Sequence, residues 1–144
     1  MAVRSAEVEL VQSIWPREAD MVELVASMPA LVDALPDAFD PHVEIRFHPD
    51  EPGEFGTLSG VEGFTAAWGE WLEPWESYRY VVEDYVDAGG GMVVVLAHVR
   101  ARTRRDGVLV EHSPAVLCRV RDGRLTKLDF YLDGAEALAA AGKL

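Results

Sequence analysis

Apolar residues in the first third of the chain recur at helical spacing. The first group predicts an amphipathic helix through Val8, Leu10, Val11, Ile14 and Trp15. Pro16 should interrupt this helix or begin the next, because proline is tolerated only in the first turn of a helix. A second group predicts a helix through Met21, Val22, Leu24, Val25 and Met28. Two prolines bracket a third short segment, residues 30–35.

A strictly alternating pattern follows and predicts a half-buried strand over residues 42–48, with Val43, Ile45 and Phe47 on one face. After a loop over residues 49–54, Ser59 and Glu62 are placed to form a capping box for another helix. One face of that helix carries an aromatic stripe at positions i, i+4, i+7 and i+11: Phe64, Trp68, Trp71 and Trp75. Pro74 marks its end.

The second half of the chain is β-rich. We expect strands over residues 78–87, 92–104, 108–121 and 125–132, joined by turns at 88–91, 105–107 and 121–123. Two of these turns contain Asp-Gly, which signals a tight hairpin, and short connections imply an antiparallel meander. An alanine-rich tail, residues 134–141, should be helical. The order predicts one α+β domain over residues 1–144, with helices on one face of an antiparallel sheet.

Charge narrows the range of partners. The net charge is −12, which repels a phosphate backbone, so we expect no nucleic-acid partner. The short basic cluster of Arg100, Arg102, Arg104 and Arg105 fits a strand end and hairpin. Cys118, the single cysteine, excludes an intrachain disulfide and fits a buried strand thiol. The apolar run at 92–97 is too short to cross a bilayer and no signal peptide is visible, so we expect a cytoplasmic protein without membrane association.

Several short motifs, in order and in register, resemble the SnoaL-like, nuclear transport factor 2-like (ketosteroid-isomerase-like) superfamily. They are Asp-Pro-His-Val-Glu at 40–44, Gly-Val-Glu-Gly-Phe at 60–64, Tyr-Val-Asp-Ala-Gly at 85–89, Arg-Asp-Gly-Arg-Leu at 121–125, Tyr-Leu-Asp at 131–133 and Glu-Ala-Leu at 136–138. The resemblance implies a cone-shaped, curved antiparallel sheet wrapped around N-terminal helices, with a pocket at its open end. It also implies a homodimer formed through the sheet.

The same resemblance implies which side chains face the pocket. On one strand they would be Leu96, His98 and Arg100; on the next, His112, Pro114, Val116 and Cys118; on the last, Leu128, Phe130 and Leu132. A slip of one residue would invert any of these sets, because side chains alternate along a strand. With Leu128 and Phe130 facing the pocket, Asp129 points outward, as a solvated or dimer-face charge.

The acids of the superfamily's best-known enzymes have no counterparts here. The ketosteroid isomerase base would fall near Ile45 or Arg46, and its two oxyanion donors near Ile14 and Val116. The acids and the arginine of limonene-type epoxide hydrolases would fall near His98, Arg100 and Phe130, with no residue type matching in place. The usual apparatus of both chemistries is therefore disfavoured.

Three polar residues remain as candidates for chemistry. We expect His112 to act as the acid or base, His98 as its partner and Arg100 as an anion stabiliser. In the opposing interpretation, His112 is a hydrogen-bonded core histidine and Arg100 points outward at the rim. The expected ligand-binding wall is Trp15, Trp68, Trp71, Leu96, Val116, Leu128 and Phe130. The tryptophans are equally explained as core filling.

The resemblance implies a SnoaL-like small-molecule protein, acting as an isomerase, cyclase or hydratase on a hydrophobic or polycyclic carbonyl compound. No organic cofactor is implied, because no glycine-rich phosphate loop follows a strand, and the histidine spacing does not indicate a metal site. The alternative is a non-catalytic ligand-binding or dimeric scaffold domain, which the missing acids favour.

Overall fold

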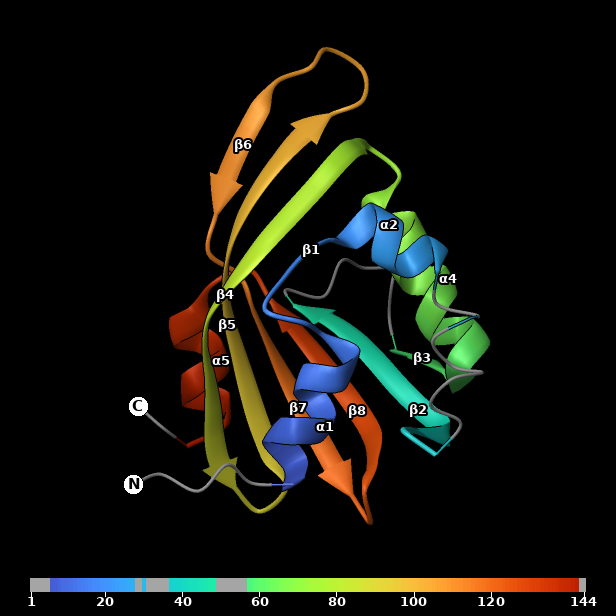
Figure 1. Cartoon of the computed structure of the whole chain (residues 1–144), viewed down its shortest axis with the longest axis vertical. Coiled ribbons are helices and arrows are strands. Elements are labelled where there is room, and N and C mark those ends of the chain that lie inside the picture. Colours follow the sequence, from blue (N-terminus) through green and yellow to red (C-terminus); the bar gives the residue numbers. More distant parts are fainter. Residues whose placement is uncertain (1–5, 28–29, 31–36, 49–56, 143–144) are drawn as a thin grey trace.

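A curved, open β-sheet is the frame of the molecule. In the computed structural model, which describes residues 6–27, 30, 37–48 and 57–142, the sheet bends around helices near the N-terminus (Figure 1). The helices are α1 (Ala6–Ile14), α2 (Met21–Ala26), α4 (Gly60–Leu72) and α5 (Gly134–Ala140). The strands are β1 (Glu18–Asp20), β2 (Phe39–His48), β3 (Thr57–Ser59), β4 (Trp75–Gly89), β5 (Met92–Thr103), β6 (Leu109–His112), β7 (Ala115–Arg121) and β8 (Arg124–Tyr131).

The strand order is β1-β4-β5-β7-β8-β2-β3, and β6 pairs with β5. The long strands of the C-terminal half pair antiparallel with their chain neighbours, which confirms the expected meander. β2 instead pairs parallel with β8, and short β1 pairs with β4. Neither pairing was predicted from the sequence, because a three-residue strand has too few positions to show alternation and a long crossover leaves no local signal.

Tight turns hold this meander in register. At the β7–β8 turn, Asp122 and Gly123 both have positive φ, 53° and 76°, as a two-residue turn between twisted strands requires. The turn after β5 is tied by a hydrogen bond from the amide of Gly107 to the carbonyl of Thr103. The structure therefore confirms the two hairpins that the Asp-Gly turns predicted.

The strand expected over residues 108–121 is divided at Ser113-Pro114 into β6 and β7. Proline has no backbone N–H and cannot donate to the ladder. The register on β5 nevertheless continues across the break, since Val99 pairs with His112 and Leu96 with Ala115. Side-chain parity is therefore preserved from β6 into β7.

The sheet is covered on both faces. The larger core lies between the concave face and α1, α2 and α4. A smaller cluster lies on the outer face, where α5 packs on β5 and β7 through Ala137, Val94 and Leu117 (Figure 1). The predicted C-terminal helix is thus confirmed, but the expectation that all helices lie on one face is wrong. Apolar outer residues such as Leu117 require a cover, and α5 provides it.

Some predicted elements end at other residues than expected, and some predictions fall on residues whose side chains the structure does not describe. Trp75 begins β4 instead of ending α4, because Pro74 stops the helix first. Leu132 follows the end of β8 and is exposed, so it does not line the concave face. The short segment at 30–35 and the capping pair Ser59 and Glu62 lie outside the part whose side chains are described. None of the described helices is long and apolar enough to cross a membrane.

Candidate active site: an aromatic cavity under the sheet

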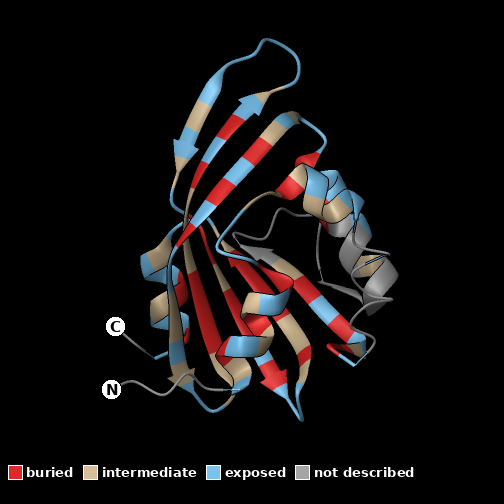
Figure 2. Ribbon diagram, in the orientation of Figure 1, coloured by how far each residue is buried: buried red, intermediate tan, exposed pale blue. Residues whose placement is uncertain are grey.

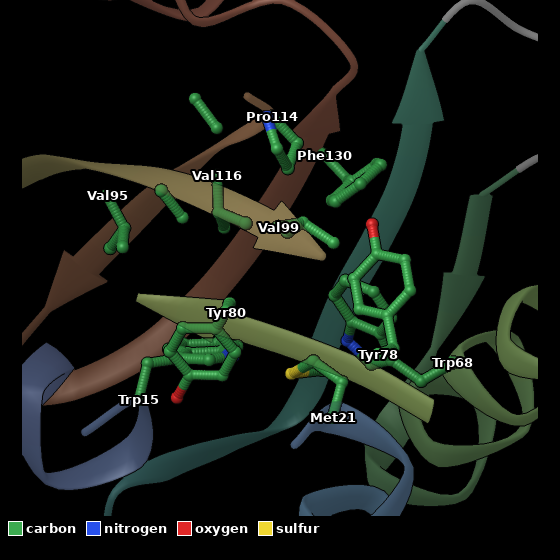
Figure 3. Close-up of a pocket in the computed structure, with 12 residues that line it drawn as sticks. Trp15, Met21, Trp68, Tyr78, Tyr80, Val95, Val99, Pro114, Val116 and Phe130 are labelled. Atoms are coloured by element: carbon green, nitrogen blue, oxygen red, sulfur yellow. The ribbon is translucent and has the colours of Figure 1, made fainter. Parts of the chain in front are cut away.

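An apolar cavity lies between the helices and the concave face of the sheet (Figure 3). The volume of the cavity is about 40 Å³. Its accessible wall is apolar, and ligand pockets are commonly lined in this way. The wall consists of Trp15, Met21, Trp68, Tyr78, Tyr80, Val95, Ala97, Val99, Pro114, Ala115, Val116 and Phe130.

Two helical tryptophans and one strand phenylalanine hold the wall in place. The rings of Trp68 and Phe130 meet edge to face, with centroids 5.3 Å apart and planes at 85°. Trp71 also packs against Phe130, with ring centroids 5.3 Å apart and planes tilted by 57°. Edge-to-face contacts of this kind favour a fixed relative orientation of the rings. The aromatic stripe of α4 therefore shapes one side of the cavity.

Strand parity decides which polar residues reach the cavity. On β4 the inward residues are Tyr78, Tyr80 and Val82, and Tyr80 pairs across the sheet with Val99 of β5. Figure 2 shows buried and exposed residues alternating along this part of β4. Because directly paired residues share a face, the inward residues of β5 are Val95, Ala97 and Val99.

The expected parity of β5 is therefore wrong by one residue. Leu96, His98 and Arg100 lie on the outer face, and Leu96 packs with the cluster under α5. The physical reason is the covering by α5. Residues 92–97 are apolar on both faces, so the sequence shows no alternation there from which the inward set could be chosen.

His98 and Arg100 are joined on the outer face by a shared carboxylate. Arg100 Nε lies 3.1 Å from Glu111 Oε1, and His98 Nε2 lies 3.6 Å from the same oxygen. His98 Nδ1 also lies 3.3 Å from Ser113 Oγ. All three ionisable side chains are about half exposed or more, where solvent screening leaves ion pairs with little net stabilisation.

His112 lies on the concave side of the sheet and is half-buried. Its Nε2 atom is 2.9 Å from the hydroxyl oxygen of Tyr78, and the two rings meet edge to face at 5.7 Å. Burial lowers the pKa of His112, and nearby His98 lowers it further. The imidazole is therefore neutral at pH 7, and in one of its tautomers Nε2–H donates to the oxygen of Tyr78, whose ring lines the cavity.

The expected ligand-binding residues divide into three groups. Trp15, Trp68, Val116 and Phe130 line the cavity. Trp71 and Leu128 support it from behind, since Trp71 packs on Phe130 and Leu128 is fully buried in the same core. Leu96 lies on the opposite face of the sheet. The structure thus gathers most of the expected wall, while a ligand role for each residue stays a prediction.

The sequence analysis missed the two tyrosines of β4. Tyr78 and Tyr80 alternate with Arg79 and exposed Val81, and this alternation was a usable signal of parity. Small residues at Ala97 and Val99 were also missed. Val99 pairs with Tyr80 and Ala97 with Val82, and both small side chains line the cavity.

Asp129 and Cys118 have no part in the cavity wall. Asp129 lies on the outer side of β8, as expected, but it is buried, at 4% exposure, instead of solvated. Arg119 approaches it, with Nε 3.9 Å from Oδ2. Cys118 is fully buried as expected, and burial raises the pKa of its thiol, which keeps it protonated and unreactive. Within the described segments, no three His, Cys, Asp or Glu residues gather as a metal site would require.

Comparison with known proteins identifies the sequence pattern and the fold. Residues 20–128 match the profile of the SnoaL-like domain. No curated protein matches the chain by sequence. Among solved structures, a putative SnoaL-like polyketide cyclase from a Jannaschia species is 19% identical, with a TM-score of 0.71 and coverage of 99% of this chain and 98% of that one.

Two further solved structures share the fold. A nuclear transport factor 2-like protein of unknown function from Burkholderia pseudomallei is 18% identical, with a TM-score of 0.70 and coverage of 94% and 97% of the two chains. TerC, co-crystallised with polyporic acid, is 16% identical, with a TM-score of 0.68 and coverage of 96% and 99%. At these identities the likeness is one of fold, which many unrelated activities share.

Proposed function

Because this chain belongs to the family of SnoaL-like domains, we propose that it binds a flat, apolar carbonyl compound in its aromatic cavity, where Tyr78 and His112 supply the polar contact. The curved sheet and the aromatic wall support an apolar ligand. The presence of polyporic acid in the TerC crystals supports a small molecule for this fold. The polyketide cyclase-like neighbours support a carbonyl compound.

The single observation that carries the proposal is the hydrogen bond between Tyr78 and His112. Burial raises the pKa of the Tyr78 hydroxyl, so Tyr78 stays protonated and can donate a hydrogen bond to a ligand oxygen. His112, neutral because burial lowers its pKa, can donate its Nε2–H to the Tyr78 oxygen, which leaves the Tyr78 O–H free to donate to the ligand. An uncharged donor in an apolar site is suited to polarising a carbonyl group.

This pair also suits stabilisation of an enolate, as an isomerase, cyclase or hydratase would need. Tyr78 would donate its O–H to the carbonyl oxygen as negative charge develops there, and the Nε2–H of His112 would polarise the tyrosine by donating to its oxygen. No cofactor enters this scheme. The alternative, binding without turnover, is favoured by one observation: among the described residues that line the cavity there is no Asp or Glu to serve as a carboxylate base.

Ligand entry must widen the cavity. The cavity, at about 40 Å³, is too small for a ring system. Met21 lines the wall, and methionine adapts its shape easily because it is unbranched. Binding should therefore be accompanied by side-chain movement in the wall.

The experiment compares two histidine variants in ligand binding. Calorimetric titration with 1-indanone, 1-tetralone and fluorenone should show binding to the unaltered protein and weaker binding to His112→Ala, by about tenfold. Any turnover of a carbonyl compound should fall with it. His98→Ala is the matched control, because it removes the same side chain from the outer face.

The control should bind like the unaltered protein. If His98→Ala weakened binding as much as His112→Ala, the assignment of the site to the concave face would be contradicted. The homodimer implied by the resemblance and the cytoplasmic location expected from the sequence stay predictions.

A further inference from the structure

Tyr80 carries a buried hydroxyl that no described residue satisfies with a hydrogen bond. The residue is only 4% exposed and lines the cavity. Two positions earlier, Tyr78 lies on the same face of β4, yet its hydroxyl is paired with His112 at 2.9 Å. Buried hydroxyls in folded proteins nearly always have partners, so an unpaired one requires an explanation.

The surroundings of Tyr80 do not offer a replacement partner. Tyr85, whose proximity affects the pKa of Tyr80, donates its hydroxyl to the backbone carbonyl of Trp15 at 2.6 Å and makes no hydrogen bond with Tyr80. Burial, and after it the proximity of Tyr85, raise the pKa of Tyr80. The Tyr80 hydroxyl is therefore a protonated donor without an acceptor in the described part of the molecule.

A trapped water does not resolve the deficit. Buried waters are held by two to four polar partners, whereas the accessible wall of this cavity is apolar. Leaving a buried donor unpaired disfavours the free state, and a ligand atom that accepts its hydrogen bond removes that disadvantage. The missing acceptor therefore indicates that Tyr80 is suited to a ligand-bound protein, in which a ligand atom accepts its hydrogen bond.

We propose that Tyr80 is a second recognition point, which donates a hydrogen bond to a neutral ligand oxygen other than the one that meets Tyr78. This inference rests on the proposed function and narrows it. The ligand class becomes flat, apolar compounds with two separate oxygen atoms, such as hydroxyketones. Tyr78 and Tyr80 are two residues apart on one strand, so their side chains leave the same face of β4 with Cα atoms about 7 Å apart.

The first test is the stability of the free protein. Tyr80→Phe removes a hydroxyl that has no partner, so its melting temperature should equal or exceed that of the unaltered protein. Tyr78→Phe is the matched control: it makes the same change on the same face but breaks the bond to His112, so its melting temperature should fall. If Tyr80→Phe lowered the melting temperature as much as Tyr78→Phe, the hydroxyl would have a partner and the inference would be overturned.

The second test is calorimetric titration with tetralin, 1-tetralone and 6-hydroxy-1-tetralone, which carry no, one and two oxygens. The unaltered protein should prefer each compound to the one before it, by about tenfold per oxygen. Tyr80→Phe should bind the two-oxygen compound no more tightly than the one-oxygen compound. Tyr78→Phe should retain one increment of the two.

The outcomes separate this inference from the proposed function. If the unaltered protein binds the ketones but Tyr80→Phe keeps the full preference for two oxygens, Tyr80 is not a recognition point and the proposed function stands. If the unaltered protein binds none of the three compounds, the proposed function is contradicted and the role of Tyr80 falls with it.

Discussion

At the scale of single residues, His112 has the most direct link between its environment and a measurable property. Its ring is half-buried, with Tyr78 at Nε2 and His98 near enough to disfavour a second positive charge. Burial and the proximity of His98 lower the pKa of His112 in the folded state below the value of about 6.5 expected in the unfolded chain. The neutral form is therefore the one that the fold prefers.

This preference predicts a pH dependence of stability. Between the lowered folded pKa and about pH 6.5, the unfolded chain binds a proton at His112 that the folded protein does not, so the free energy of unfolding rises with pH across this window. Urea unfolding from pH 5 to pH 7.5 should show this rise. The part of this rise that comes from His112 should be absent from His112→Gln. If the free energy of unfolding rose equally with pH in the two proteins, the burial of His112 would be contradicted.

The sequence shows which residues carry suitable chemistry, but it does not always show which face of the sheet their side chains occupy. His112, Pro114 and Val116 were assigned to the concave side, and the structure places them there or at the cavity wall. His98 and Arg100 were assigned to the same side and lie on the other. A long apolar run such as 92–97 leaves the parity of its strand undetermined, and only the pairing of β4 with β5 resolves it.

At the scale of elements, the β4–β5 hairpin depends on one close approach. Gly89, Gly90 and Gly91 all have positive φ, and the amide of Val120 donates to the Gly91 carbonyl at 2.7 Å. A Cβ atom on Gly91 would collide with the Val120 carbonyl oxygen, whereas one on Gly90 would meet open space. The hairpin can therefore lie against β7 only because position 91 lacks a side chain.

Two alanine substitutions test this approach. Gly91→Ala should lower the free energy of unfolding by about 2–4 kcal/mol, because backbone strain is added to a collision with backbone atoms. Gly90→Ala has the same kind of φ but no collision and should lose only about 1 kcal/mol. Chemical denaturation of both variants gives the comparison. Equal losses would mean that the hairpin does not lie as close to β7 as described.

Elements with a local signal were predictable. The Asp-Gly turns fixed two hairpins, and the helical spacing of residues 8–15 located α1. Pairings that depend on distant parts of the chain were not predictable. β1 has three residues and exists through its pairing with β4, and β2 lies parallel to β8 through contacts that no short segment encodes. The covering of the outer face by α5 is likewise a tertiary property.

At the scale of the whole molecule, the sheet separates two surfaces with different chemistry. The concave side holds the aromatic cavity. The outer side carries the charged group of Arg79, Arg100, Arg102 and Glu111 beside exposed Val81 and Leu109. The cone and its pocket were predictable from the order of the motifs, because fold depends on the whole pattern. The ligand was not, because it depends on a few side-chain directions inside the cone.

The central claim, that a ligand occupies the concave cavity, is tested most directly by filling it. Val116 lines the cavity, so Val116→Phe should occupy part of the space, whereas Val81→Phe adds the same ring to the exposed outer face. Thermal unfolding of each variant with the ketone series measures binding as added stability. A ligand at 100 times its Kd adds about 2.7 kcal/mol.

We expect ketone-dependent stabilisation of the unaltered protein and of Val81→Phe, and none of Val116→Phe. Equal stabilisation of Val116→Phe and the unaltered protein, or no stabilisation of any of the three, would contradict the assignment of the cavity as the ligand site.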